Sequence, residues 1–194
     1  MAIWLLKQSV KKGQMGKERQ APYYDIHYRK TGVAISSPMI PIIAYIADVL
    51  RERKVKSVLD IGCGAGAMLA ECEKANIISY GFDFSPEAIK LCKESRKLKN
   101  TWIGDARHSD NFVKEYDAYL CLEVLEHIKD DIGVIKNLRS GVLFIFSVPT
   151  FIGQSSHVRR FKTDGQIRVR YDKFVNIENI KLFWERRVTI GRIK

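Results

Sequence analysis

The sequence contains no long hydrophobic run, no closely spaced pair of cysteines and no internal repeat. A membrane-spanning helix needs about 20 consecutive apolar residues, and the apolar stretch Ile3–Leu6 is too short for the core of a secretory signal peptide. We therefore expect a soluble, cytoplasmic protein. None of the four cysteines lies in a C-x-x-C pair, which favours reduced thiols and argues against a structural zinc site.

The sequence also lacks the aromatic and basic motifs of RNA-recognition modules, although its formal net charge is +11. The excess lies at the two ends, with +4 in residues 1–20 and +7 in residues 157–194. Between them, residues 21–156 contain 17 basic and 17 acidic side chains. Such ends are typical of proteins that bind an anionic partner (RNA, a membrane surface or a phosphorylated metabolite), but also of a solvated basic surface.

Low-complexity linkers are absent, so the 194 residues are expected to form a single structural domain. Within it, residues 1–50 differ in character from residues 51–194. Residues 7–20 are polar and basic, which predicts an exposed or mobile arm, and the aromatic cluster Tyr23–Tyr28 follows. We expect the first segment to form an arm and helices, and the second to form the core.

Beyond residue 50 the sequence alternates between apolar, β-branched runs and segments with helical periodicity. Strands are predicted at 55–61, 77–82, 101–103, 116–122, 141–148, 174–180 and 184–193, and helices at 42–50, 67–74, 124–138, 164–171 and after Ser85. This alternation predicts an α/β fold, a mostly parallel sheet with helices on both faces. Because no helix separates the last two strands, we expect them to form an antiparallel hairpin at the edge.

A glycine-rich loop, Gly62-Cys63-Gly64-Ala65-Gly66, follows the first predicted strand and its Asp60. Glycine lets a ligand approach the main chain closely, and ligands bind at the carboxyl ends of strands in open parallel sheets. The loop alone is ambiguous, because Gly62-x-Gly64-x-x-Ala67 also fits a loose NAD-binding pattern. The sequence therefore predicts a ligand site here without identifying the ligand.

Two acidic residues follow the next two strands. Asp83 lies 17 residues after Gly66, where a carboxylate can accept hydrogen bonds from both hydroxyls of a ribose. An ordinary turn aspartate is the alternative. In Gly104-Asp105-Ala106, after the third strand, the acidic residue can bind the amino group of adenine. These positions favour an adenosine-containing ligand.

The segment Leu120–Ile128, which contains LEVLEHI, completes an ordered set of motifs with the glycine loop, Asp83 and Asp105. Over about residues 55–193, this set resembles the class I S-adenosylmethionine-dependent methyltransferases. It is most similar to a small group that includes ubiquinone-pathway O-methyltransferases. The resemblance implies a Rossmann-like three-layer sandwich, with a seven-stranded, mostly parallel sheet whose last strand is antiparallel. It also implies S-adenosylmethionine (SAM) as cofactor and S-adenosylhomocysteine (SAH) as product.

The resemblance further implies which residues contact SAM. The glycine loop would lie behind the methionine, steadied by Asp60, and Asp83 would hold the ribose. Asp105 would bind the adenine, and Glu123 would lie beneath the methionine and the reacting methyl. The full set of implied cofactor-binding residues is Asp60, Gly62, Cys63, Gly64, Gly66, Asp83, Phe84, Ser85, Asp105, Ala106, Leu122 and Glu123.

Methyl transfer from a sulfonium is an in-line displacement, so the protein mainly positions the reactants. A general base is needed only if the acceptor must lose a proton. The candidates are His27, His108, His127 and His157, of which we expect His108 to be structural or solvated. We predict catalytic roles for His127, His157 and Glu123.

A metal site is a second hypothesis for the same segment. If the chain is helical from Leu122, then Glu123, Glu126 and His127 share one face, and His157 could complete a site for Mg²⁺ or Mn²⁺. Small-RNA 2′-O-methyltransferases and some ubiquinone-pathway O-methyltransferases use a similar cluster. Such a metal would lower the pKa of an acceptor hydroxyl. The alternative is that no metal binds, and that the carboxylates lie near a helix start because the helix dipole favours negative charge there.

Residues flanking the core are the candidates for acceptor binding. We expect His157 and Arg159 to contact the acceptor, since arginine suits a carboxylate or phosphate; a salt-bridged turn is the alternative. Tyr23, Tyr24 and His27 are expected to form a lid, or else to pack an N-terminal helix.

The preferred function is methyl transfer to an oxygen or nitrogen of a small or medium-sized acceptor. The alternatives are an RNA methyltransferase that uses the basic ends, and a non-catalytic binding module. An NAD-dependent oxidoreductase is disfavoured, because nothing in the sequence indicates a hydride-transfer site.

Overall fold

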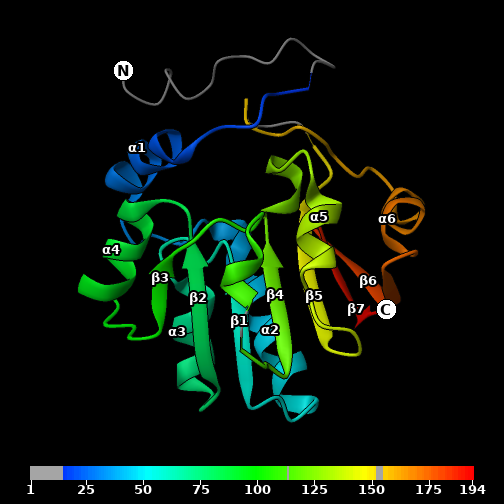
Figure 1. The fold of residues 1–194 in the computed structure, drawn as a ribbon, viewed down its shortest axis with the longest axis horizontal. Coiled ribbons are helices and arrows are strands. Elements are labelled where there is room, and N and C mark those ends of the chain that lie inside the picture. The colour runs from blue at the N-terminus through cyan, green and yellow to red at the C-terminus, as the bar shows by residue number, and fades with distance from the viewer. Residues whose placement is uncertain (1–14, 113, 152–154) are drawn as a thin grey trace.

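The computed structural model describes residues 15–112, 114–151 and 155–194 of the chain. It contains a seven-stranded sheet in the order β3-β2-β1-β4-β5-β7-β6 (Figure 1). The strands are β1 (Ser57–Ile61), β2 (Ile78–Asp83), β3 (Thr101–Ile103), β4 (Ala118–Leu122), β5 (Leu143–Pro149), β6 (Val175–Phe183) and β7 (Arg186–Ile193). The predicted Rossmann-like α/β fold is confirmed.

The direction of each strand follows the prediction. Strands β1 to β5 pair in parallel, and β7 runs antiparallel to both β5 and β6. The last two strands form the expected hairpin, and β6 lies at the sheet edge. All parallel strands therefore end at one edge of the sheet, where an open α/β fold binds its ligands.

Two apolar cores lie on opposite faces of the sheet. Helices α2 (Ile40–Glu52) and α3 (Ala67–Lys74) pack on one face, and α5 (Asp131–Lys136) and α6 (Asp164–Tyr171) pack on the other. Successive residues of β4 alternate between these cores, as the pleat of a strand requires: Leu120 faces α2 and Cys121 faces α5. Both faces are covered, which explains why the strands are continuously apolar.

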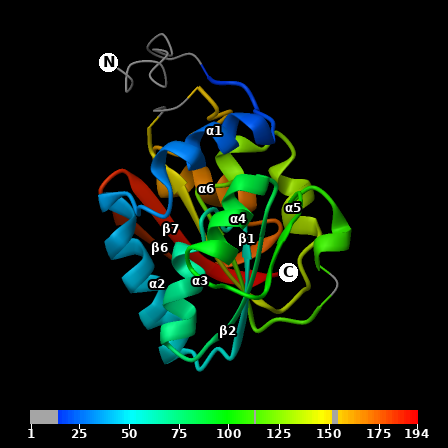
Figure 2. The same cartoon turned by 90° about the vertical axis from the view of Figure 1, so that its left-hand side faces the viewer.

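Helix α1 (Ala21–Thr31) contains no buried residue and lies across the carboxyl ends of the strands (Figures 1 and 2). It is adjacent to α4 (Pro86–Glu94), whose N-cap is Ser85, as predicted. The Ser85 hydroxyl accepts a hydrogen bond from the Ala88 N–H. These two helices frame the edge of the sheet where the glycine loop emerges.

The predicted helix over residues 124–138 is wrong. After β4 the chain forms a short 3₁₀ turn, η3 (Leu125–His127), then becomes extended at Ile128, and α5 begins only at Asp131. The guanidinium of Arg159 donates hydrogen bonds to the carbonyls of Leu125, Ile128 and Lys129. These long-range contacts hold the segment in an irregular path that overrides its helical periodicity.

The N-terminal arm is only partly described. Residues 7–14 lie outside the described residues, but residues 15–20 do not form a free arm. The N–H groups of Gly16 and Lys17 donate to the carbonyls of His157 and Ser155, respectively. Across the part of the chain that the structure describes, no helix is long and apolar enough to cross a membrane.

The packing of α2 makes a first prediction about stability. Ile46 is fully buried in the core, whereas Ile40, on the same helix, is 57% exposed. We expect Ile46→Ala to lower the free energy of unfolding by about 2–5 kcal/mol, because it removes buried methyl groups and leaves a cavity. Ile40→Ala is the matched control and should change it by less than about 0.5 kcal/mol. Urea unfolding followed by circular dichroism measures both, and similar losses would contradict this account of the core.

Candidate active site

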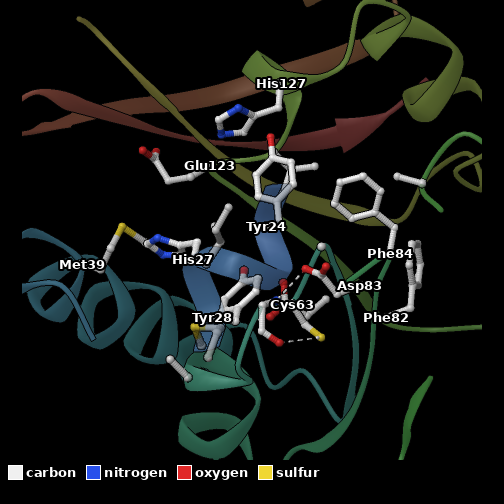
Figure 3. A pocket seen from close by; sticks show the side chains of 18 of the residues that line it. Tyr24, His27, Tyr28, Met39, Cys63, Phe82, Asp83, Phe84, Glu123 and His127 are labelled. Carbon is white, nitrogen blue, oxygen red and sulfur yellow. Dashed lines mark hydrogen bonds between the residues drawn. The ribbon is translucent and has the colours of Figure 1, made fainter. Parts of the chain in front are cut away.

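A cavity of about 920 Å³ lies between α1 and the carboxyl ends of the parallel strands (Figure 3). Its walls come from α1, the glycine loop, the ends of β2 and β4, the loop after β3, and the first residues of α2. Arg186, the first residue of β7, also lines it. The volume is in the range of pockets that hold cofactors.

The glycine loop approaches its neighbours closely. Gly62 and Gly64 have positive φ angles of 70° and 54° and line the cavity. A Cβ atom on Gly64 would lie 2.7 Å from the Tyr28 hydroxyl, and one on Gly62 would lie 2.5 Å from the Val124 side chain. Gly66 differs from the sequence-based expectation, because it does not line the cavity and packs instead against Leu98.

Asp83 joins the glycine loop to the start of α4. One carboxylate oxygen accepts from the Gly64 N–H at 3.0 Å, and the other accepts from the Ser85 N–H at 2.9 Å. Burial raises the pKa of Asp83 to about 6. The Ser85 side chain, expected to bind cofactor, does not line the cavity, because its hydroxyl caps α4 and donates to Asp25.

Asp60 is buried in the cavity wall with a relative exposure of 2%. Burial, together with the nearby charge of Asp83, raises the pKa of Asp60 to about 8. We expected Asp60 to steady the glycine loop, but no hydrogen bond joins its carboxylate to the loop amides among the described residues; Asp83 has that role. Two buried carboxylates without a nearby cation suit a positively charged ligand, and SAM is one.

The residues expected to bind adenine also line the cavity. Asp105 and Ala106 lie in its wall with Phe84, and Cys63 lines it from within the glycine loop. The Asp105 carboxylate forms an ion pair of 2.5 Å with Arg107, and this lowers the pKa of Asp105. Both of its oxygens also accept hydrogen bonds from Arg107, from the backbone N–H and from the guanidinium, so most of the carboxylate's acceptor capacity is used within the fold.

Glu123 and Leu122 line the cavity at the end of β4. Glu123 has a positive φ of 58°, which turns the chain out of the strand. Its carboxylate accepts from the Ser147 hydroxyl at 2.8 Å and from Arg186 Nε at 2.9 Å. The sequence analysis did not identify Arg186 as a site residue. The pairing of β5 with β7 brings it to this wall, and no pattern in the neighbouring residues predicts that pairing.

Glu126, His127 and His157 form a second cluster, whose potential ligand atoms all lie within 4.8 Å of one another. The Glu126 carboxylate is fully buried, and neither oxygen has a hydrogen-bond partner among the described residues. Burial lowers the pKa of His127 to about 4, so its imidazole is neutral. The expected four-residue cluster is thus corrected: Glu123 bonds to Ser147 and Arg186 and lies outside this group of three, since no helix aligns them.

Arg159 does not contact the cavity, contrary to the expectation that it binds the acceptor. Besides the three carbonyls described above, its guanidinium lies 3.1 Å from the carboxylate of Asp131. Since its donors are used in the fold, Arg159 is a structural residue. His157 also lies outside the cavity lining, behind His127, with the ring centroids 4.8 Å apart. His108 is exposed at the surface.

The aromatic residues of α1 cover the cavity. Tyr23, Tyr24 and His27 all line it, and the Tyr24 ring lies 5.1 Å from Phe84 and 5.7 Å from His127. In Figure 3, Tyr24 lies between Glu123 on one side and Phe84 on the other, next to His127. The helix that carries these residues is bound through Asp25, which accepts from the Ser85 hydroxyl and the Glu87 N–H.

Comparison with known proteins identifies the class. A family model described as a methyltransferase domain matches residues 29–186, and the chain belongs to this family. This family agrees with the class that the order of motifs along the sequence predicts.

Similar proteins extend this finding. The ubiquinone biosynthesis O-methyltransferase of Haemophilus ducreyi is 29% identical over 107 residues, which are 48% of this chain and 45% of that protein. The enzyme of the same name from Aliivibrio fischeri is 29% identical over 87 residues, covering 42% of this chain and 37% of that one. The chain thus spans less than half the length of these curated relatives.

A solved structure supports the fold. Magnesium protoporphyrin IX methyltransferase from Synechocystis PCC 6803, with bound SAH, superposes with a TM-score of 0.68 at 18% identity. The match covers 90% of this chain and 96% of that one.

The raised pKa of Asp60 predicts a pH dependence of stability. An acid whose pKa is higher in the folded protein stabilises it at low pH, and this contribution is lost as the pH rises toward the folded value. Between pH 5 and 8, Asp60 should therefore reduce the stability of the ligand-free protein, by at most about 1.4 kcal/mol per pH unit. We expect Asp60→Asn to flatten this decline.

The measurement is the urea midpoint of unfolding at several pH values from 5 to 8. Asp48→Asn, which changes an exposed aspartate on α2, is the matched control and should keep the wild-type slope. If the slope of Asp60→Asn equals that of the wild-type protein, the pKa of Asp60 is not raised in the folded protein.

Proposed function

We propose that this protein transfers the methyl group of SAM to an oxygen or nitrogen atom of a small or medium-sized acceptor, in the cytoplasm. The observation that carries this proposal is the cavity, in which Asp83 and the glycine loop face residues suited to hold an acceptor. SAM supplies a methyl group that is already electrophilic on its sulfonium. The protein's task is to align the two reactants and to exclude water.

The wall that contains Asp83 would hold the cofactor. Asp83 keeps lone pairs free after accepting from Gly64 and Ser85, so it can also accept from the hydroxyls of a ribose. Asp105 would bind the adenine amino group. The proposed cofactor-binding residues are Asp60, Gly62, Cys63, Gly64, Asp83, Phe84, Asp105, Ala106, Leu122 and Glu123.

The part of the cavity beyond Tyr24 would hold the acceptor. Tyr23, Tyr24 and His27 would cover it, and Met39 and Ile43 line it with apolar surface. If the acceptor must lose a proton and no metal ion is bound, His127 can accept it, because its imidazole is neutral and lines the cavity. A small or medium-sized acceptor suits a pocket of this kind, lined in part by apolar side chains.

An RNA acceptor is less well supported by the surface charge. Many basic side chains near the C-terminus are used in ion pairs within the fold: Arg159 and Arg170 with Asp131, Arg186 with Glu123, Arg187 with Asp164, and Arg192 with Glu178. Arginines that bind phosphate must be free to contact it. A non-catalytic binding module is disfavoured by the intact glycine loop and Asp83.

Asp83 provides the direct test of the cofactor site. We expect Asp83→Asn to weaken SAH binding by about 1–3 kcal/mol, roughly fivefold to 150-fold, because the ribose loses a charged acceptor. Isothermal titration calorimetry measures the dissociation constant, with Asp110→Asn, at an exposed position, as the control. An unchanged affinity would remove Asp83 from the site, and a wild-type protein that binds neither SAM nor SAH would refute the proposed function.

The acceptor is then sought with tritiated SAM in a fractionated cell extract. Label in small molecules would support the proposal, whereas label in RNA would favour the RNA methyltransferase. Binding of cofactor without any labelled fraction would favour the binding module.

We also propose that Glu126, His127 and His157 hold a divalent cation. The specific observation is the buried, unpartnered Glu126 carboxylate beside two imidazoles. Two imidazoles and one carboxylate suit a transition-metal ion such as Mn²⁺ better than Mg²⁺. The cation would bind an acceptor hydroxyl and lower its pKa.

Glu126→Gln tests this site. In a Mn²⁺ titration followed by electron paramagnetic resonance, the wild-type protein should bind Mn²⁺. Glu126→Gln should bind it at least about tenfold more weakly, because an anionic ligand is lost. Glu123→Gln is the matched control and should retain Mn²⁺ binding, since Glu123 lies outside the group of three. The metal site is excluded if the wild-type protein does not bind Mn²⁺, or if both variants lose it equally.

A further inference from the structure

One ion pair is built into the cavity wall. Glu123, from the end of β4, and Arg186, from the start of β7, both line the cavity and are joined at 2.9 Å between Oε2 and Nε. Their side chains are 21% and 17% exposed, respectively. Since a half-buried ion pair is costly to desolvate, its position in a binding cavity calls for a functional reason.

Arg186 is held in place independently of Glu123. It pairs with Pro149 in the β5–β7 register, and its guanidinium lies over the Phe151 ring at 5.6 Å from the centroid. The other oxygen of Glu123 accepts from the Ser147 hydroxyl. Both carboxylate oxygens are therefore fixed by residues of neighbouring strands, which sets the direction of the carboxylate.

The pair also sets the charge of Glu123. Burial raises the pKa of this carboxyl, whereas Arg186 and Ser147 act in the opposite direction. Glu126, three residues further along the chain, has no hydrogen-bond partner among the described residues, and burial raises its pKa well above the usual value. A carboxylate bonded to arginine is a poor proton acceptor, so Glu123 is better suited to act as a fixed charge than as a base.

We infer that Glu123 is the negative charge by which the cavity prefers the sulfonium of SAM to the uncharged thioether of SAH, and that Arg186 is its positioning residue. This inference rests on the proposed placement of the cofactor's methionine beneath the end of β4. The two ligands share their adenosine and amino-acid groups and differ in the methylated, charged sulfur. A charge near the sulfur therefore discriminates between them, whereas contacts elsewhere affect both equally.

The test compares the dissociation constants of SAM and SAH by calorimetry. We expect Glu123→Gln to reduce the preference for SAM over SAH about tenfold at every pH from 6 to 8.5. Arg186→Met should reduce it at pH 7 and recover it as the pH rises, because the buried Glu123 is then ionised only at higher pH. Arg186→Lys should keep the preference at pH 7. Asp60, Asp83 and His127 also face the cavity, but they are common to all variants.

Arg187→Met is the matched control. Arg187 is the next residue on β7 and binds Asp164 and the Phe161 carbonyl outside the cavity, so its variant should keep the wild-type preference. If Glu123→Gln weakens SAM and SAH equally, or if Arg186→Met shows no recovery with pH, the inference is wrong. A wild-type protein that binds neither ligand would instead refute the proposed function.

Discussion

The arrangement of the cavity at the carboxyl ends of the parallel strands depends on the Asp83 carboxylate. It accepts hydrogen bonds from the N–H groups of Gly64 and Ser85, and so connects the loop after β1 to the helix after β2. Ser85 in turn donates to Asp25, which secures α1 over the cavity. One side chain therefore joins the floor of the cavity to its cover, and a ligand that bonds to Asp83 acts on all three elements.

The fold and the cofactor side of the site were largely predictable from the sequence, because their signals are local. Alternating periodicity locates the strands, and the glycine loop and Asp83 each follow a strand directly. The pair of Glu123 and Arg186 was not predictable, since only the β5–β7 pairing brings these residues together. The path after β4 was missed for a similar reason: Arg159, far along the chain, binds its carbonyls.

Local charge differs from net charge in this molecule. The chain carries a formal charge of +11, yet acidic and basic side chains line its binding cavity in nearly equal numbers: Glu18, Asp60, Asp83, Asp105 and Glu123 against Arg19, Lys30, Arg107 and Arg186. Arg186, the basic residue closest to Glu123, is neutralised by it. The basic excess at the two ends of the chain is therefore not reproduced in the cavity, and it says little about the ligand. A charge pattern along a sequence constrains function only when the fold shows which side chains face the site.

The four buried carboxylates of this region fall into two kinds. Asp83 and Glu123 have hydrogen-bond donors in the fold, which fix their direction before any ligand arrives. Asp60 and Glu126 have none among the described residues, and burial raises the pKa of each. A buried carboxylate without a partner reduces stability unless it is protonated or meets a cation. The first kind therefore suits a ligand group that must meet a charge held in a fixed direction, as we infer for Glu123 and the sulfonium. The second kind suits a cation that binds the carboxylate directly, as we propose for a divalent metal ion at Glu126.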